Sequence, residues 1–114
     1  MVVAQKYKKP VVLEEFGFPR DGFRFSKSTS TEVRDEYYQY VFDLIRQDRE
    51  NGGLFAGCNF WAWGGFAEQN PEHIYWEKGD DYTGDPAQEE QGLNSVFATD
   101  TTVEIIKTEN AKLK

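Results

Sequence analysis

Two short apolar segments on either side of one amphipathic segment limit what this chain of 114 residues can fold into. The first is Val11–Glu15, which is apolar until its last two residues, and the second is Leu54–Trp63, LFAGCNFWAW. Nearly continuous apolar runs are typical of strands in a parallel sheet, where both faces are covered. Because two strands do not make a stable sheet by themselves, we expect an α/β fold that is one piece of a larger architecture.

The segments around these strands show helical spacing. Apolar residues at intervals of three and four predict a helix from the capping box Thr29–Glu32 to about Glu50. Its expected apolar stripe is Val33, Tyr37, Val41, Leu44 and Ile45, with Tyr38 and Phe42 beside it. A second capping box, Thr101–Glu104, predicts a final helix with an apolar side made of Val103, Ile106 and Leu113. Met1–Tyr7 is expected to be the end of an earlier helix, which Pro10 stops.

Loops follow the C-terminal ends of both predicted strands. Gly17–Ser28 follows the first strand, and Phe66–Thr99, which is rich in Gly, Pro, Asp, Glu and Asn, follows the second. A loop longer than about 15 residues is uncommon in a compact domain. In βα barrels the active-site loops follow the C-terminal ends of the strands. The unusual chemistry of this chain lies at those two ends, in Glu14–Gly17 and Trp61–Gly65.

The charge balance narrows the classes of partner. With 13 Lys and Arg against 20 Asp and Glu, the net charge is −7, which argues against nucleic acid and against an anionic membrane surface. No apolar run approaches the length that spans a membrane, and the N-terminal residues lack the long apolar core of a signal peptide. The single cysteine, Cys58, excludes an internal disulfide and is expected to be a small buried thiol. A sugar, or a neutral or cationic partner, stays compatible with the composition.

Two adjacent carboxylates, Glu14 and Glu15, end the first predicted strand. Neighbouring residues of a regular strand point to opposite faces, so we do not expect them to act as a pair on one ligand. A carboxylate at a strand tip that faces a cavity can be a nucleophile, a base or a metal ligand. On spacing alone, a solvated strand end with an incidental pair of carboxylates is the favoured interpretation.

Aromatic residues mark the end of the second predicted strand. Trp61 and Trp63 are expected to share a face and to form a flat platform suited to the C–H face of a sugar ring; core packing is the alternative. The only histidine, His73, has no Cys or His partner and is a poor metal candidate. The carboxylates of Asp80, Asp81 and Asp85 do not follow the calcium-loop spacing. We therefore predict no metal site and no cofactor.

Four stretches together carry a resemblance: KPVVLEEFGFPRDGF, YYQYVFDLI, GCNFWAWGG and YTGDPAQEEQGLNSVF. From Lys9 to about Val103 the chain resembles the C-terminal part of glycoside hydrolase family 5 enzymes, and most closely the bacterial endo-β-1,4-mannanases. The family fold is a (β/α)8 TIM barrel. The resemblance implies that residues 1–114 are a single partial domain, the C-terminal quarter of the barrel: strand 7, helix 7, strand 8, a long loop and helix 8.

The resemblance also assigns roles. It implies that Glu15 is the nucleophile of a retaining glycosidase, that Trp61 stacks on the sugar, and that Trp63 is a neighbouring candidate. Trp76, in the long loop, is expected to shape an adjacent subsite. Retaining enzymes use two carboxylates roughly 5 Å apart, and the family's acid/base Glu belongs to strand 4, which has no counterpart here. The chain is therefore expected to be inactive by itself.

Several functions stay open at this point. The main expectation is the C-terminal portion of an extracellular or periplasmic enzyme that hydrolyses β-mannosidic bonds in mannan-type polysaccharides. Its strand edges would need the N-terminal portion of the barrel, or self-association, to cover them. The alternatives are a non-catalytic carbohydrate-binding or interaction module, a fragment of a related β-1,4-glucanase (cellulase), and an inert folding remnant.

Overall fold

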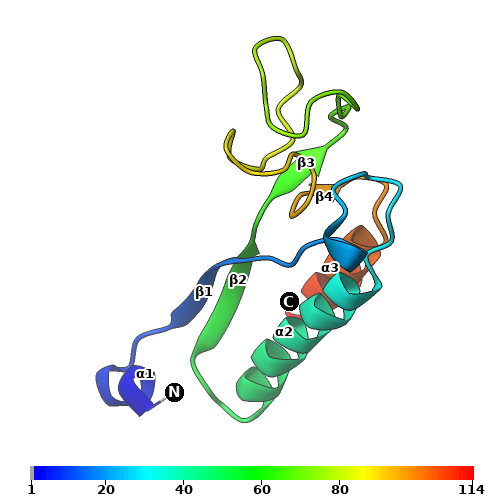
Figure 1. Ribbon diagram of the computed structural model, residues 1–114. Helices are drawn as coiled ribbons and strands as arrows, with labels where there is room; N and C mark the ends of the chain where they lie inside the picture. The colour runs from blue at the N-terminus through cyan, green and yellow to red at the C-terminus, as the bar shows by residue number, and fades with distance from the viewer. Residues whose placement is uncertain (1) are drawn as a thin grey trace.

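A computed structural model describes residues 2–114 as an elongated molecule of 51 × 24 × 23 Å, with α1 at one end and the long loop at the other (Figure 1). In chain order its elements are α1 (Val2–Tyr7), β1 (Val11–Phe16), the 3-10 helix η1 (Asp21–Phe23), α2 (Glu32–Glu50), β2 (Phe55–Phe60), β3 (Trp63–Gly65), β4 (Val96–Phe97) and α3 (Thr102–Lys112). The predicted order of helix, strand, helix, strand, loop and helix is confirmed over the described residues.

The predicted parallel pair of strands is also confirmed. β1 pairs with β2 in parallel, and the register runs from Val11 opposite Phe55 to Phe16 opposite Phe60. The helix α2 connects the two strands and packs along them, with α3 beside it (Figure 1). The carboxyl ends of β1 and β2 therefore lie together at one edge of the sheet, as the parallel arrangement requires.

The second strand is shorter than predicted. Instead of one strand over Leu54–Trp63, β2 ends at Phe60, a cis peptide bond joins Trp61 to Ala62, and β3 begins at Trp63. β3 pairs in parallel with β4, a strand of two residues inside the segment predicted to be a loop. A strand this short leaves no alternation in the sequence, which is why periodicity did not reveal it.

The buried face of α2 differs from the predicted stripe. Its buried residues are Arg34, Tyr38, Val41, Phe42 and Ile45. Val33 and Leu44, which were expected in the core, are 49% and 41% exposed. The face is rotated because a charged residue, Arg34, lies within it and hydrogen-bonds to loop carbonyls. The core combines this face with Phe16 and Val96, and the apolar side of α3 packs against it as predicted.

Neither predicted capping box forms. The N-cap of α2 is Thr31 rather than Thr29, and the first free N–H groups, of Glu32 and Val33, donate to the carboxylate of Asp21 in η1. Thr101 is the N-cap of α3 as expected, but its hydroxyl donates to the carboxylate of Asp35 on α2 instead of capping its own helix. Partners from distant segments thus replace the local bonds that the sequence pattern suggested.

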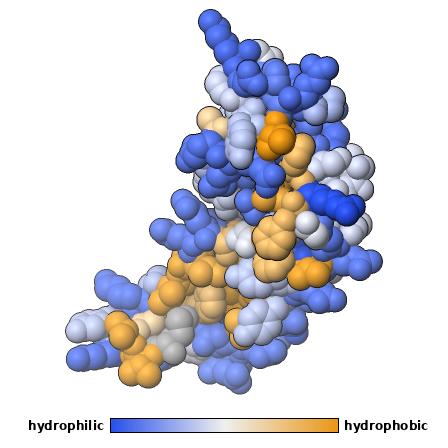
Figure 2. All heavy atoms as spheres, viewed as in Figure 1, coloured by the Kyte–Doolittle hydropathy of each residue, from blue (hydrophilic) through white to orange (hydrophobic). Residues whose placement is uncertain are grey.

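The sheet is covered on one face only. Leu13 packs against the core, while Val12, which alternates with it on β1, is 46% exposed. Figure 2 shows apolar side chains gathered over β1 and β2 and at α1, whereas polar side chains dominate the long loop. The prediction that both faces of β1 are covered is therefore wrong for this chain.

Candidate functional site

The ends of β1 and β2 are joined directly. The Trp61 N–H donates to the Phe16 carbonyl at 2.7 Å, immediately after the paired residues Phe16 and Phe60. At Gly17, a Cβ atom would lie 2.7 Å from the Trp61 carbonyl oxygen, closer than any real side chain tolerates. Glycine is required there because the two backbones touch. This contact places Glu15 one residue from the point where the chain meets Trp61.

The backbone around the two carboxylates is irregular. Glu15 has φ +46°, in the left-handed region, and the pairing with β2 shifts register between Leu13 and Phe16. Both Glu14 and Glu15 are exposed. The expectation that they point to opposite faces assumed a regular strand, and the strand is not regular at this position. A residue held with positive φ at a strand tip is a reason to suspect a functional role.

Tyr38 packs against the end of β1 and bonds to the residue that follows β2. It is fully buried in α2, its ring lies 4.8 Å from the ring of Phe16, and its hydroxyl donates to the Trp61 carbonyl at 3.4 Å. Burial raises the pKa of Tyr38 well above its ordinary value, so the hydroxyl keeps its proton. The sequence placed Tyr38 beside the helical stripe but gave no sign that it contacts the strand tips.

Trp61 and Trp63 lie in different elements. Trp61 follows β2 and is 36% exposed, whereas Trp63 begins β3 and is 55% exposed, with the buried Ala62 between them. The Trp63 indole lies close to Gly65, which has φ +58°. The prediction that one continuous strand carries both rings is wrong, because β2 ends at Phe60 and β3 begins at Trp63. Both indole rings are nevertheless accessible to solvent, one directly after β2 and the other at the start of β3.

Trp76 lies in the outer part of the long loop. Its indole N–H donates to the Asp80 carbonyl at 3.1 Å, and the ring is partly buried. This part of the loop extends beyond β3, away from β1 and β2 (Figure 1). The structure therefore places Glu15 one residue before Phe16, whose carbonyl accepts the Trp61 N–H, with Trp63 two residues farther along and Trp76 in the outer part of the long loop.

Two buried arginines hold the loops above the strand ends. Arg34 donates to the carbonyls of Phe18 at 2.8 Å, Leu93 at 2.8 Å and Ser95 at 2.9 Å. Arg20 pairs with the buried carboxylate of Asp100 at 2.5 Å and also donates to the Gly92 and Ser95 carbonyls. Arg34 lies 3.6 Å from the same carboxylate. Sequence reasoning missed this cluster because its members are far apart in the chain and arginine is ordinarily a surface residue. The position of Arg34 four residues before Tyr38 was the one available signal.

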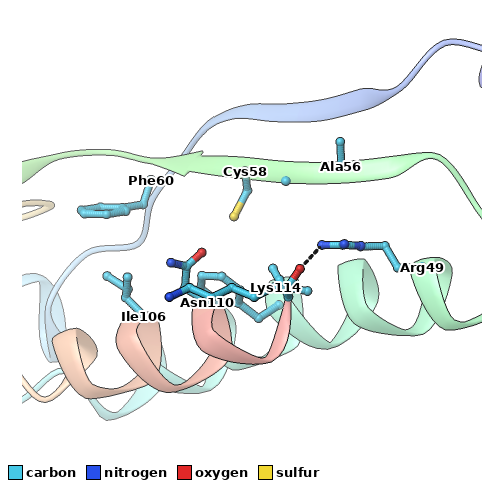
Figure 3. Close-up of a pocket in the computed structure, with 10 residues that line it drawn as sticks. Arg49, Ala56, Cys58, Phe60, Ile106, Asn110 and Lys114 are labelled. Carbon is cyan, nitrogen blue, oxygen red and sulfur yellow. Dashed lines mark hydrogen bonds between the residues drawn. The ribbon is translucent and has the colours of Figure 1, made fainter.

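A cavity of about 400 Å³ lies on the helix side of β2, between this strand and the helices α2 and α3 (Figure 3). Cys58 points toward the helices, and Arg49 closes one end through a 2.6 Å bond to the Leu113 carbonyl. Burial raises the pKa of the Cys58 thiol, which is half-buried rather than fully buried as expected. None of the candidate site residues lines this cavity, so it is a gap in packing and not the site.

Two further properties concern the part of the chain that the structure describes. Within residues 2–114, no three His, Cys, Asp or Glu side chains gather closely enough to hold a metal ion. None of the helices in this range has the length and apolar character needed to cross a membrane.

A family model, a related sequence and solved structures all match this chain to mannosidases. The model of the GH family 5 beta-mannosidase-like family matches residues 1–114. A protein of Arabidopsis thaliana named mannan endo-1,4-beta-mannosidase P is 37% identical over 54 residues, which cover 47% of this chain and 12% of that protein.

Solved structures match over nearly the whole chain. A glycoside hydrolase family 5 mannosidase from Rhizomucor miehei aligns with 40% identity and a TM-score of 0.81, covering 96% of this chain and 28% of that chain. A glutamate-to-alanine variant of it, in complex with mannosyl-fructose, aligns with the same values. Enzymes of this family are TIM barrels, and the chain matches part of one. It spans less than a third of the length of these relatives.

Proposed function

Because the chain belongs to the β-mannosidase-like members of glycoside hydrolase family 5, we propose that it is the C-terminal part of a retaining endo-β-1,4-mannanase. In this proposal residues 1–114 form a single partial domain, the last quarter of the barrel. β1 is strand 7, α2 is helix 7, β2 is strand 8 and α3 is helix 8. The substrate is a β-mannan, and the reaction is hydrolysis of its β-mannosidic bonds.

One observation carries the assignment of the site. The 2.7 Å bond from Trp61 N–H to the Phe16 carbonyl puts the tip of β1 against the end of β2. A sugar ring that stacks on the Trp61 indole would then lie beside the strand tip that bears Glu15. We assign Glu15 as the nucleophile and Trp61 as the platform for the sugar at the cleaved bond, with Trp63 and Trp76 as further sugar contacts.

The proposed chemistry of Glu15 follows from its carboxyl group and its position at the strand tip. A carboxylate attacks the anomeric carbon, the bond to the leaving-group oxygen breaks, and a covalent glycosyl-enzyme forms, which water later hydrolyses. The leaving oxygen needs a proton from a second carboxyl group roughly 5 Å from the first. We propose that this acid, which also serves as the base for the water, comes from the preceding part of the barrel.

The exposed apolar surface supports the proposal that a preceding part of the barrel packs against this chain. Val12 on β1 is 46% exposed, and Val2 and Val3 on α1 are 84% and 69% exposed. Both outer edges of the pair β1 and β2 are unpaired in the described residues. Unpaired edges and open apolar surface favour association, and strands of the same barrel would cover both. A mannan polymer is too large for passive uptake, so we place the parent enzyme outside the cell or in the periplasm.

A graft tests the proposal. In a chimera, this chain replaces the matching segment of the Rhizomucor miehei mannosidase, with which it shares 40% identity. Mannan hydrolysis is measured for the chimera, for its Glu15→Gln variant and for the 114-residue chain alone. We expect turnover by the chimera, its loss in Glu15→Gln, and none from the chain alone. A chimera that folds and binds mannan without turnover would favour a carbohydrate-binding module instead.

A further inference from the structure

A compact polar cluster closes the outer part of the long loop. Two reverse turns, closed by the bonds His73 N–H to Asn70 O at 3.1 Å and Asp80 N–H to Glu77 O at 3.0 Å, lie against each other. The second turn contains Gly79 with φ +105°, a conformation that favours glycine. The Asp80 carboxylate joins the turns by accepting hydrogen bonds from the Asn70 amide at 2.9 Å, the Glu77 N–H at 3.0 Å and His73 Nδ1 at 2.9 Å.

Both ring nitrogens of His73 face carboxylates. Nδ1 lies 2.9 Å from Asp80 and Nε2 lies 3.2 Å from Glu77. When the ring carries both protons and a positive charge, Nδ1 donates to Asp80 and Nε2 forms an ion pair with Glu77, because an ionised carboxylate only accepts hydrogen bonds. The hydrogen bond to Asp80 raises the pKa of His73 above its ordinary value of 6.5. At Asp80 the hydrogen bond from Asn70 has the largest effect among those that lower the pKa.

Asp80 is also the hydrogen-bond partner of Trp76. The carbonyl of Asp80 accepts the indole N–H of Trp76 at 3.1 Å, while its carboxylate is fixed by the neighbouring turn. Anything that displaces the Asp80 backbone therefore moves the hydrogen-bond partner of the indole. The neighbours of Trp76 in the same loop, Ile74 and Tyr75, are 44% and 54% exposed, so the loop presents apolar side chains around this indole.

We propose that His73 and Asp80 are positioning residues for Trp76, and that the positive charge of His73 is what keeps the indole in place. His73 contacts the Asp80 carboxylate through Nδ1 and the Glu77 carboxylate through Nε2. These two contacts fix the turn that contains the Asp80 carbonyl, which accepts the Trp76 indole N–H. When His73 loses its charge, one nitrogen loses its proton, and a carboxylate is left facing a lone pair. The turn then loosens and the Trp76 ring loses its fixed orientation.

The direction of the pH dependence follows from the charges. The charged groups that face His73 are acidic: Asp80, Glu77 and, farther away, Glu72. A second segment packs on this loop, because the Gln91 N–H donates to the Ile74 carbonyl. The side chain of Gln91 is uncharged. A histidine whose folded pKa is raised stabilises the fold fully below 6.5, and this contribution is lost as the pH rises through the raised value. Trp76 is therefore fixed near pH 6.5 and is released as the pH rises through the raised pKa of His73.

NMR titration of the 114-residue chain tests the proposal without any carbohydrate, so the result is independent of the proposed activity. His73 is the only histidine, and its ring signal is unambiguous; Trp76→Phe assigns one of three indole signals. We expect His73 to titrate above 6.5 and the Trp76 indole N–H signal to shift with the same midpoint. In His73→Gln the indole signal should lose that midpoint, and in Asp80→Asn the His73 value should fall toward 6.5.

The control is Glu72→Gln, which removes a distant charge without removing a hydrogen bond to the ring; it should leave the coupling between the two signals intact. A His73 midpoint at or below 6.5, or a Trp76 indole signal that stays flat while His73 titrates, would overturn the proposal. An unfolded loop would give the same ordinary midpoint and counts against it equally.

Discussion

Replacing Arg34 by methionine tests the buried cluster that holds the loops in place. Methionine keeps a long side chain but removes the charge and three hydrogen bonds. The Leu93 and Ser95 carbonyls keep Arg20 as a second donor, at 3.0 and 3.3 Å, while the Phe18 carbonyl loses its side-chain donor. Asp100 keeps its 2.5 Å pair with Arg20. One orphaned carbonyl costs about 1–3 kcal/mol, and two weakened ones add roughly 1–2 kcal/mol together.

The expected loss in the free energy of unfolding is therefore about 2–5 kcal/mol, a large share of the total for a small domain. Urea unfolding followed by tryptophan fluorescence measures it, and hydrogen exchange shows whether residues 17–28 and 91–97 open first. The matched control is Arg49→Met on the same helix, where the exposed side chain makes one bond to the Leu113 carbonyl. Its cost should stay below about 1 kcal/mol. Equal losses in the two variants would refute the role assigned to Arg34.

Three further variants test the tip contact, the register of α2 and its cap. Gly17→Ala should separate the strand tips and speed hydrogen exchange at the Trp61 N–H, because the new Cβ would lie 2.7 Å from the Trp61 carbonyl oxygen. The control Gly57→Ala should leave this exchange unchanged, because its new Cβ would have no atom within 4 Å. Ile45→Ala should cost about 2–5 kcal/mol in urea unfolding, and Leu44→Ala, at a side chain that is 41% exposed, should cost far less. Equal losses would restore the stripe expected from the sequence, which contains both residues. The hydrogen bond from Ser30 lowers the pKa of Asp21 below 3.8, so amide protection at Glu32 and Val33 should be lost as pH falls below that value, and Asp21→Asn should abolish this titration.

Local pattern was enough to predict the element order and the parallel strands. Apolar continuity and helical spacing are properties of neighbouring residues, and β1, α2, β2 and α3 are all longer than one turn or one pleat. The tip residues Glu15 and Trp61 could be singled out because their chemistry is unusual for a strand end. Their contact through Phe16 follows from parallel pairing.

What the sequence did not predict depends on long-range partners. Asp21 replaces the capping box of α2, and Arg34 turns the helix face by bonding to carbonyls some 60 residues away. The irregular backbone at Glu15 removed the alternation on which the separation of Glu14 from Glu15 depended. In each case a contact between distant segments outweighed a local preference, which a single sequence cannot show.

The site of a covalent adduct tests the central claim most directly. The chimera with the Rhizomucor miehei mannosidase is treated with a 2-deoxy-2-fluoro-mannosyl fluoride. Its fluoride leaving group lets the glycosyl-enzyme form, and its electron-withdrawing C2 fluorine slows the later hydrolysis, so that the glycosyl-enzyme accumulates. Peptide mass spectrometry then locates the sugar. An adduct on Glu15, absent from Glu15→Gln and retained in Glu14→Gln, is the predicted result. An adduct on Glu14, or none on this chain in a chimera that hydrolyses mannan, would contradict the assignment.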